Sequence, residues 1–316
     1  MSDTRENKGY FVFTLDTELA WGHYDCFTPT MFSANGQEER KVIERLLDIF
    51  EQFNIVATWA IVGHMFFEKC EKCDFCPILE WKGKYEVFNK IYEADDPLWY
   101  GADIIELLIR DNPRHEIAFH GYTHKVFDEN LLSKEEARRE IREWLRVSQR
   151  KNIIPKSVVF PKNKIGHLDI LKDEGFVCYR GEQILPGIFS IPILGKILER
   201  IDNLIQFVPP EVFDPKIEPS GLMNLPSSRR LFGMNRRVSL VLDMLKLPYL
   251  NMDCIIKGVN KAANEKKVIH IRSHPYEFRT EKDYDKLRYL LQVVSAEIKI
   301  GRMQSIGMAN LANILF

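Results

Sequence analysis

The chain contains, at residues 115–124, the stretch His115-Glu116-Ile117-Ala118-Phe119-His120-Gly121-Tyr122-Thr123-His124, in which a short apolar run leads into two histidines spaced four residues apart. The run predicts a strand over residues 115–120, so that His120 ends the strand and His124 follows it. In α/β proteins, sites form at the carboxyl ends of strands. Two histidines with this spacing also occur by chance, and the alternative is that His120 is a core residue and His124 a loop residue.

An acidic pair follows a second apolar run about a hundred residues earlier. The run Tyr10-Phe11-Val12-Phe13-Thr14-Leu15 predicts a buried parallel strand, and Asp16-Thr17-Glu18 comes directly after it. A buried carboxylate must be paired, hydrogen-bonded or bound to a metal, because an unpaired buried charge is costly. Two imidazoles and one carboxylate are the usual protein ligands of an open catalytic zinc site. We therefore expect His120, His124 and one of the two acidic residues to share a divalent cation.

The rest of the chain alternates predicted strands and helices with short connections. Strands are expected at residues 10–15, 55–62, 115–120, 157–160, 176–179, 268–271 and 304–307, and helices at 38–53, 103–110, 133–151, 168–173, 237–247, 281–299 and 310–315. This alternation is typical of a parallel α/β fold and favours a (β/α) barrel. Residues 1–316 are expected to form one catalytic domain with insertions at about 64–99 and 181–265, the second covering the mouth of the barrel.

Composition narrows the class of protein. Hydrophobic residues make up 45% of the 316 residues and charged residues 28%, which is ordinary for a globular protein, and the net charge of −1 gives no field that favours nucleic acid. The first residues lack the apolar segment of a secretory signal, and no apolar run is long enough to span a membrane, so a cytoplasmic location is expected. Three cysteines, Cys70, Cys73 and Cys76, have a metal-ligand spacing but lack a clear fourth ligand. The alternative is three reduced thiols without a metal.

Two further stretches carry candidate residues. In His270-Ile271-Arg272-Ser273-His274-Pro275, either histidine has a side chain whose unperturbed pKa of ~6.5 suits a general acid. His270 lies inside a predicted strand and suits a core residue, so His274 is the preferred candidate. In the turn 160–166, Lys162 or Asn163 is placed to orient a carboxylate or a substrate oxygen, although an ordinary turn explains it equally well.

Together these motifs resemble the polysaccharide deacetylases of the NodB-homology type, carbohydrate esterase family 4. The order is the family's: an acidic motif after the first strand, a histidine pair, a Pro/Gly turn and a late histidine. The sequence departs from the family at Thr17, where the usual motif has a second aspartate, and at Pro161-Lys162-Asn163, where the family carries an arginine that orients the catalytic aspartate. Asn224-Leu225-Pro226 is the candidate remnant of a fourth motif.

This resemblance implies a distorted (β/α) barrel of NodB type and a metal-dependent enzyme, with zinc as the expected cofactor, that removes an N-acetyl group from a sugar. It implies Glu18, His120 and His124 as metal ligands and Asp16 and His274 as catalytic base and acid. Lys162, Asn163 and Trp21 are the expected substrate-binding residues. The alternatives are an amidohydrolase acting on a small non-sugar amide and a binding protein that has kept the fold without activity.

The expected substrate is a carbohydrate in a glycan or glycan precursor, including a lipid- or nucleotide-linked one, because the expected cytoplasmic location disfavours extracellular polymers. If the precursor is lipid-linked, the apolar stretch Gly187 to Ile205 and the basic residues Arg229, Arg230, Arg236 and Arg237 are candidates for contact with a membrane surface. The preferred alternative is that the stretch packs over the barrel and that the arginines form a solvated face. No nucleic acid partner is expected, and the sequence does not define the oligomeric state.

Overall fold

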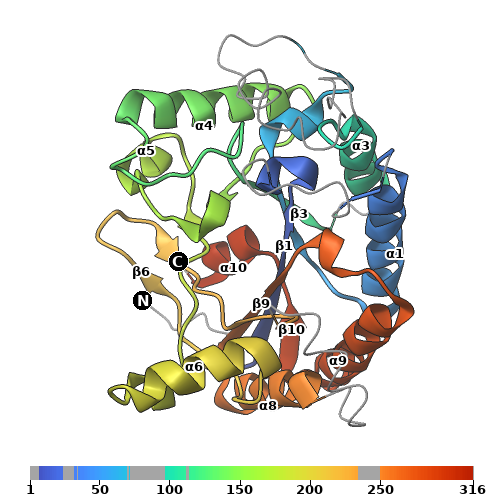
Figure 1. The fold of residues 1–316 in the computed structure, drawn as a ribbon, viewed down its shortest axis with the longest axis vertical. Helices are drawn as coiled ribbons and strands as arrows, with labels where there is room; N and C mark the ends of the chain where they lie inside the picture. The colour runs from blue at the N-terminus through green and yellow to red at the C-terminus, as the bar shows by residue number, and fades with distance from the viewer. Residues whose placement is uncertain are drawn as a thin grey trace.

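The computed structural model describes residues 7–23, 32–33, 35–69, 71, 97–111, 114–233 and 250–315, and Figure 1 shows a curled sheet with helices around it. The strand order is β6-β7-β5-β4-β3-β2-β1-β9-β8, with β10 also paired to β1, and every pairing except β6–β7 is parallel. The strands are β1 (Gly9–Thr17), β2 (Thr58–Ile61), β3 (Glu116–Phe119), β4 (Ser157–Val158), β5 (Cys178–Tyr179), β6 (Lys216–Ile217), β7 (Met223–Asn224), β8 (Arg229–Arg230), β9 (Val268–Ser273) and β10 (Met303–Ser305).

Strand β1 is the centre of the sheet. All nine of its residues are buried, because it pairs with neighbouring strands on both edges and is covered on both faces. This explains its continuous apolar and aromatic run, which is the pattern of a parallel strand without a solvent-facing side. The expected strand at residues 10–15 is confirmed, and it extends to Thr17, so that Asp16 lies inside the strand and Glu18 directly after it.

Helices pack around the outside of the sheet, with α1, α8 and α9 along one part of the rim and α4 and α5 along another (Figure 1). The α-helices are α1 (Gln37–Phe53), α3 (Ala102–Asp111), α4 (Lys134–Gln149), α5 (Leu168–Asp173), α6 (Leu194–Ile205), α8 (Leu250–Glu265), α9 (Glu281–Lys299) and α10 (Met308–Leu315). The 3-10 turns are η1 (Leu19–His23), η2 (Gly63–Phe66), η4 (Pro161–Asn163), η5 (Gly187–Ser190) and η6 (Pro275–Glu277).

Helix α4 illustrates how local sequence sets an element. The capping box predicted at Ser133 and Glu136 is present, with each side chain satisfying the other's backbone N–H group. On the inner face, Ile141 and Trp144 are buried, and the Trp144 indole donates a hydrogen bond to the backbone oxygen of Ile61 at 2.7 Å. The helix is therefore tied to the end of β2, next to the loop that carries the two histidines.

The segment Met223–Arg230 joins the two sides of the curled sheet. Its first part, β7, pairs with β5, and its last part, β8, pairs with β9. The expected insertion at residues 181–265 thus contains strands of the sheet itself. The helix predicted at 237–247 and the three cysteines Cys70, Cys73 and Cys76 lie outside the described residues.

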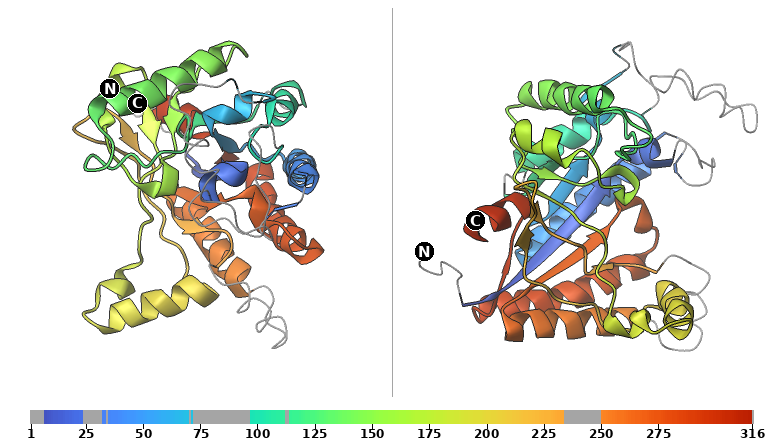
Figure 2. Two further views of the ribbon diagram at one scale, coloured as in Figure 1. Left: turned by 45° about the horizontal axis from the view of Figure 1, so that its top comes forward. Right: turned by 90° about the vertical axis from the view of Figure 1, so that its left-hand side faces the viewer.

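Helix α6 lies at the periphery of the molecule (Figure 2). Large aliphatic side chains on and before it are exposed, among them Ile193, Leu194, Ile197 and Ile201. The expectation that this stretch buries its apolar side chains over the barrel is therefore wrong. Within the described residues, no helix combines the length and apolar character needed to cross a bilayer.

Candidate metal centre

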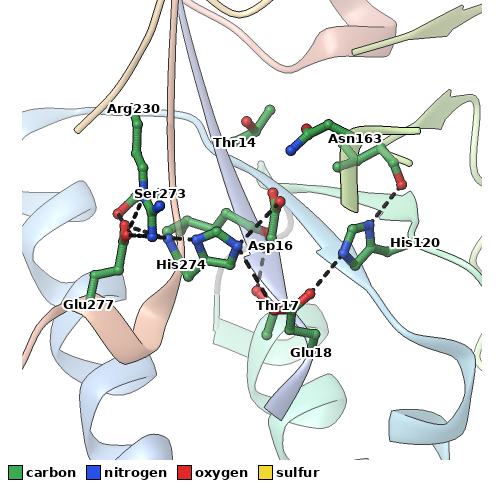
Figure 3. Close-up of polar contacts among 12 residues, drawn as sticks. Thr14, Asp16, Thr17, Glu18, His120, Asn163, Arg230, Ser273, His274 and Glu277 are labelled. Atoms are coloured by element: carbon green, nitrogen blue, oxygen red, sulfur yellow. Dashed lines mark hydrogen bonds and ion pairs between the residues drawn. The ribbon is translucent and has the colours of Figure 1, made fainter. Parts of the chain in front are cut away.

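The predicted site residues come from three strand ends that lie close together in the sheet. Asp16 and Glu18 end β1, His120 follows β3, and His274 follows β9, and these strands fall within four adjacent positions of the sheet order. Figure 3 shows the two acidic side chains between His274 on one side and His120 on the other. All four are buried or nearly so, which places their charges in an environment where electrostatic interactions are strong.

Glu18, His120 and His124 form a compact group of possible metal ligands. Their ligand atoms lie within 4.8 Å of one another, and Glu18 Oε2 is 3.1 Å from His120 Nε2 and 2.9 Å from His124 Nε2. Three side chains with oxygen and nitrogen donors, all buried, match the protein share of an open catalytic zinc site. The expectation that His120 and His124 are a core residue and an unrelated loop residue does not fit this convergence.

Hydrogen bonding around His120 indicates that the group is incomplete without a cation. Its Nδ1 lies 2.7 Å from the backbone oxygen of Val159, which only accepts, so Nδ1 donates there and Nε2 is the nitrogen that faces Glu18, as a lone pair when the ring is neutral. Two lone pairs facing each other at this distance repel unless a proton or a metal ion lies between them. A backbone acceptor on the far nitrogen is also the usual partner of a metal-bound histidine. The residues present therefore fit a divalent cation.

The turn between the two histidines is held by a buried carboxylate from helix α4. Glu140 accepts hydrogen bonds from the backbone N–H groups of Tyr122 and Thr123, both at 2.8 Å, and from the Thr123 hydroxyl at 2.6 Å. Gly121 and His124 adopt positive φ angles of 76° and 59°, which fold the turn back on itself. The unfavourable backbone conformation of His124 brings its imidazole back toward Glu18.

Gly22 is the residue that leaves space for Glu18. A Cβ atom at this position would lie 1.9 Å from Glu18 Oε1 and 2.0 Å from its carboxyl carbon. Any side chain at residue 22 would push the carboxylate away from the histidines. The glycine of η1 is therefore required by close packing and not by its backbone conformation.

Asp16 is paired with an arginine that the motif search missed. Arg180, directly after β5, donates to both carboxylate oxygens of Asp16, at 2.5 and 2.7 Å, and the same guanidinium donates to Asn163 Oδ1 at 2.7 Å. Burial raises the pKa of the Asp16 carboxyl, but the charge and hydrogen bonds of Arg180 outweigh burial and hold the pKa well below its usual range. A charged residue immediately after a predicted strand was the available signal for Arg180.

His274 lies on the other side of Asp16. Its Nε2 is 3.6 Å from Asp16 Oδ2 and 3.9 Å from Glu18 Oε1, and the Tyr276 ring packs against the imidazole. Burial lowers the pKa of His274, whereas Glu277 and the two acidic residues raise it by more, so the net pKa is above its usual value. This environment favours the imidazolium form that a general acid needs.

Glu277 stabilises the charged form of His274 and is itself fixed by neighbours. Its Oε2 accepts hydrogen bonds from the Ser273 hydroxyl at 2.6 Å and from the His274 backbone N–H at 3.1 Å, and its Oε1 pairs with Arg230. Burial raises the pKa of Glu277, but His274 and Arg230 lower it to about 2. The sequence analysis did not identify this residue.

The other predicted residues have different positions. His270 is fully buried with its ring nitrogens 3.1 Å from the Leu225 backbone oxygen and the Thr14 hydroxyl, so the preference for His274 over His270 agrees with the geometry. Asn163 reaches the site through Arg180, whereas Lys162 is exposed on η4.

The expectation that Trp21 binds substrate is wrong. Its side chain has no exposed surface, and its indole donates to the Trp99 backbone oxygen at 2.6 Å. Trp21 therefore packs the core beneath η1. The basic residues named as a solvated face also differ from expectation, since Arg229 is buried against Asp202, while Arg236 and Arg237 lie outside the described residues.

No family model and no curated protein matches this sequence. Solved structures do match. One is a protein assigned as a polysaccharide deacetylase from Mycobacterium smegmatis, with 13% identity and a TM-score of 0.54. The alignment covers 98% of this chain and 91% of that protein. A second protein with the same assignment, from Pseudomonas aeruginosa PAO1, has 13% identity and a TM-score of 0.56, covering 96% and 90%. Puue allantoinase has 12% identity and a TM-score of 0.57, covering 96% and 89%. The chain therefore has the fold of the NodB-type polysaccharide deacetylases, a distorted (β/α) barrel.

Proposed function

We propose that this protein is a metal-dependent hydrolase that removes an N-acetyl group from a sugar. One observation carries the proposal: a buried carboxylate and two imidazoles converge on one point, with an arginine-paired aspartate and a third histidine beside them. Carbohydrate as substrate is supported by the two structurally similar proteins that are assigned as polysaccharide deacetylases.

Glu18, His120 and His124 are the residues that would hold the cation. When bound, a divalent metal, zinc by this donor set, polarises an amide carbonyl and lowers the pKa of an attacking water to ~7. Val159 and Glu140 act behind these ligands, the first by fixing the tautomer of His120 and the second by holding the turn that presents His124.

Asp16 and His274 divide the proton transfers. Arg180 keeps Asp16 ionised and fixes its plane, so that the carboxylate is oriented to accept a proton from the attacking water. His274, held charged by Glu277, is placed to give a proton to the departing amine nitrogen. Arg180 thus performs the orienting role that the sequence Pro161-Lys162-Asn163 lacks, and this weakens the alternative of a binding protein without activity.

The proposal is tested with purified protein, by measuring bound divalent metal and the acetate released from N-acetylated sugars. His124→Ala should lose both, whereas His115→Asn, a change in the same sequence stretch but away from the cluster, should keep both. The His115 Nδ1 only accepts a hydrogen bond from the Ala57 backbone at 3.0 Å, which an asparagine oxygen can replace. Acetate release that survives in His124→Ala, or wild-type protein that binds no divalent metal, would refute the proposal.

A second function has one observation in its favour, the structural similarity to Puue allantoinase. On this alternative the same side chains cleave a small non-sugar amide. Release of ammonia or formate from small amides, without release of acetate from N-acetylated sugars, would establish it in place of the deacetylase.

A further inference from the structure

A small cavity lies between helix α6 and strands β8 and β9. Its volume is about 50 Å³, and its lining includes three arginines, namely Arg229, Arg230 and Arg272. A buried water needs about 10–15 Å³ of such space, so the cavity has room for a few oxygen atoms. The lining also includes the amide side chains of Gln183, in the loop after β5, of Asn203 on α6 and of Gln206 directly after α6. Asp202, which is paired with Arg229, and Phe232 complete it.

The three arginines are not equally neutralised. Arg229 pairs with Asp202, and Arg230 pairs with Glu277. Within the described part of the chain, the Arg272 side chain has no ion pair and no hydrogen bond. Burial, together with the charge of Arg180, lowers the pKa of Arg272 to about 10, so the group is still charged at neutral pH and unfavourably placed. A partly buried guanidinium without an acceptor among the described residues has N–H groups available to an anion.

The cavity is connected to the proposed active site. Arg272 pairs in register with Thr14 and precedes His274 by two residues, so both side chains leave the same face of β9 and their Cα atoms are about 7 Å apart. Arg230 lines the cavity and contacts the same Glu277 that holds His274. A ligand group in this cavity would therefore lie beside residues that also hold the proton-donating histidine.

We propose that this cavity binds a phosphate group carried by the substrate, with the Arg272 guanidinium as its main contact. The proposal rests on the proposed function, because it adds to an N-acetylated sugar the requirement for a phosphate substituent. A guanidinium presents paired N–H donors that match phosphate oxygens. Donors from β8, β9 and the loop after β5 surround the space from several directions, which suits a tetrahedral anion better than a planar carboxylate.

The first test measures binding of inorganic phosphate by calorimetry, in protein freed of metal. Arg272→Met should weaken binding about 10–100-fold, the loss expected for a charged hydrogen-bonding partner. Arg288→Gln, which removes an exposed arginine paired only with Asp285, is the matched control and should bind phosphate as the wild type does. Equal phosphate affinity in wild type and Arg272→Met would overturn the proposal.

A second readout does not depend on binding strength. Because Arg272→Met removes a partly buried charge that has no ion pair, the variant should unfold at a higher temperature than the wild type without phosphate and should gain less when phosphate is added. Glu18→Gln, which alters the metal group and not the cavity, should still be stabilised by phosphate. If the wild type binds phosphate but releases acetate from no N-acetylated sugar, the phosphate site stands and only the proposed function is rejected. A wild type that phosphate does not stabilise rejects the cavity site.

The third test separates the sources of the phosphate. With N-acetylglucosamine 1-phosphate, Arg272→Met should raise KM relative to kcat, and the preference over unphosphorylated N-acetylglucosamine should fall about 10-fold or more. Phosphatidylcholine vesicles that contain a polyisoprenyl phosphate form the other arm, since α6, which contributes Asp202 and Asn203 to the cavity, also carries exposed aliphatic side chains. Sedimentation with these vesicles that requires Arg272 assigns a lipid-linked phosphate. No preference for either phosphate-bearing ligand in the wild type contradicts the proposal.

Discussion

Strand β3 has a partly buried glutamate at one end and a buried histidine site at the other, and the two ends differ in the chemistry of their neighbours. At its start, Glu116 accepts hydrogen bonds from the hydroxyls of Thr58 and Ser157 and from the Ala309 backbone N–H. Beyond its end, Glu18 faces His120 and His124, and the His120 lone pair points at it. Both carboxylates are shielded from solvent, Glu116 in part and Glu18 almost fully, but only Glu18 lacks a full set of donors.

The difference shows how a structural carboxylate can be told from a ligand. Glu116 sits at the N-terminus of α10, where backbone N–H groups and the helix dipole favour a negative group. Its environment is complete, and it fastens the last helix to the amino end of the sheet. The partners of Glu18 are two imidazoles, which can bind a cation together with the carboxylate. A bound cation would therefore supply the positive partner that Glu18 lacks. Burial alone does not distinguish the two roles, whereas the direction of each hydrogen bond does.

The largest effect is expected from exchanging the two glutamates for glutamine in turn. Glu18→Gln should weaken the affinity for divalent metal by more than about 100-fold, because even changes behind a metal ligand cost 10–100-fold. Glu116→Gln should leave metal affinity within a few-fold of the wild type. Metal content after dialysis and calorimetric titration measure both. Similar losses in the two variants would remove the distinction drawn between them.

Asp16 extends the comparison to a third carboxylate, because its closest partner, Arg180, is a donor. By the same reasoning we predict that Asp16 is not a metal ligand. Asp16→Asn should keep the metal and lower turnover about 10²–10⁴-fold, the usual contribution of a general base. Metal titration and acetate release from the same preparation measure the two effects. A variant that loses the metal would make Asp16 the ligand in place of Glu18.

Gly22 tests whether the position of the Glu18 carboxylate matters as much as its charge. Gly22→Ala places a methyl group where Glu18 Oε1 now lies, so metal affinity should fall about 10–100-fold. Gly187→Ala is the control, since a Cβ atom there meets nothing within 4 Å. Calorimetric metal titration of the two alanine variants makes the measurement, and unchanged affinity in Gly22→Ala would mean that the carboxylate can move without cost.

The sequence predicted the sheet around β1 and the convergence of the acidic pair with the histidines, because buried strands have continuous apolar runs and site residues follow them directly. It did not predict Arg180, because its partner Asp16 is distant in sequence. It did not predict Glu277 either, because an acidic residue in the turn after β9 has the same pattern whether it is solvated or pairs with His274 and the distant Arg230. It also predicted too few strands, because β7 and β8 have two residues each and leave no periodic pattern. Trp21 was misassigned because an aromatic residue near a site motif has the same pattern whether it packs or binds.

The smallest expected effect is a pH dependence of stability that comes from Glu116. Burial raises the pKa of this carboxyl above its usual value, and its hydrogen bonds only partly oppose the shift. The folded protein therefore binds the proton more tightly than the unfolded chain does, and the free energy of unfolding contributed by this group falls as pH rises above the unfolded pKa of about 4.3.

Glu116→Gln has no proton to lose at this position and provides the reference. The wild type minus variant difference in free energy of unfolding should therefore decrease between about pH 4 and the raised folded pKa of Glu116, and then level off. Urea unfolding at several pH values, with a chelator present to exclude metal effects, gives the difference directly. A difference that grows with pH would mean that the donors around Glu116 favour its charged form more strongly than burial opposes it. The groups at the amino end of β3 would then stabilise a carboxylate anion, and Glu116 and Glu18 would differ only in that Glu18 faces two histidines.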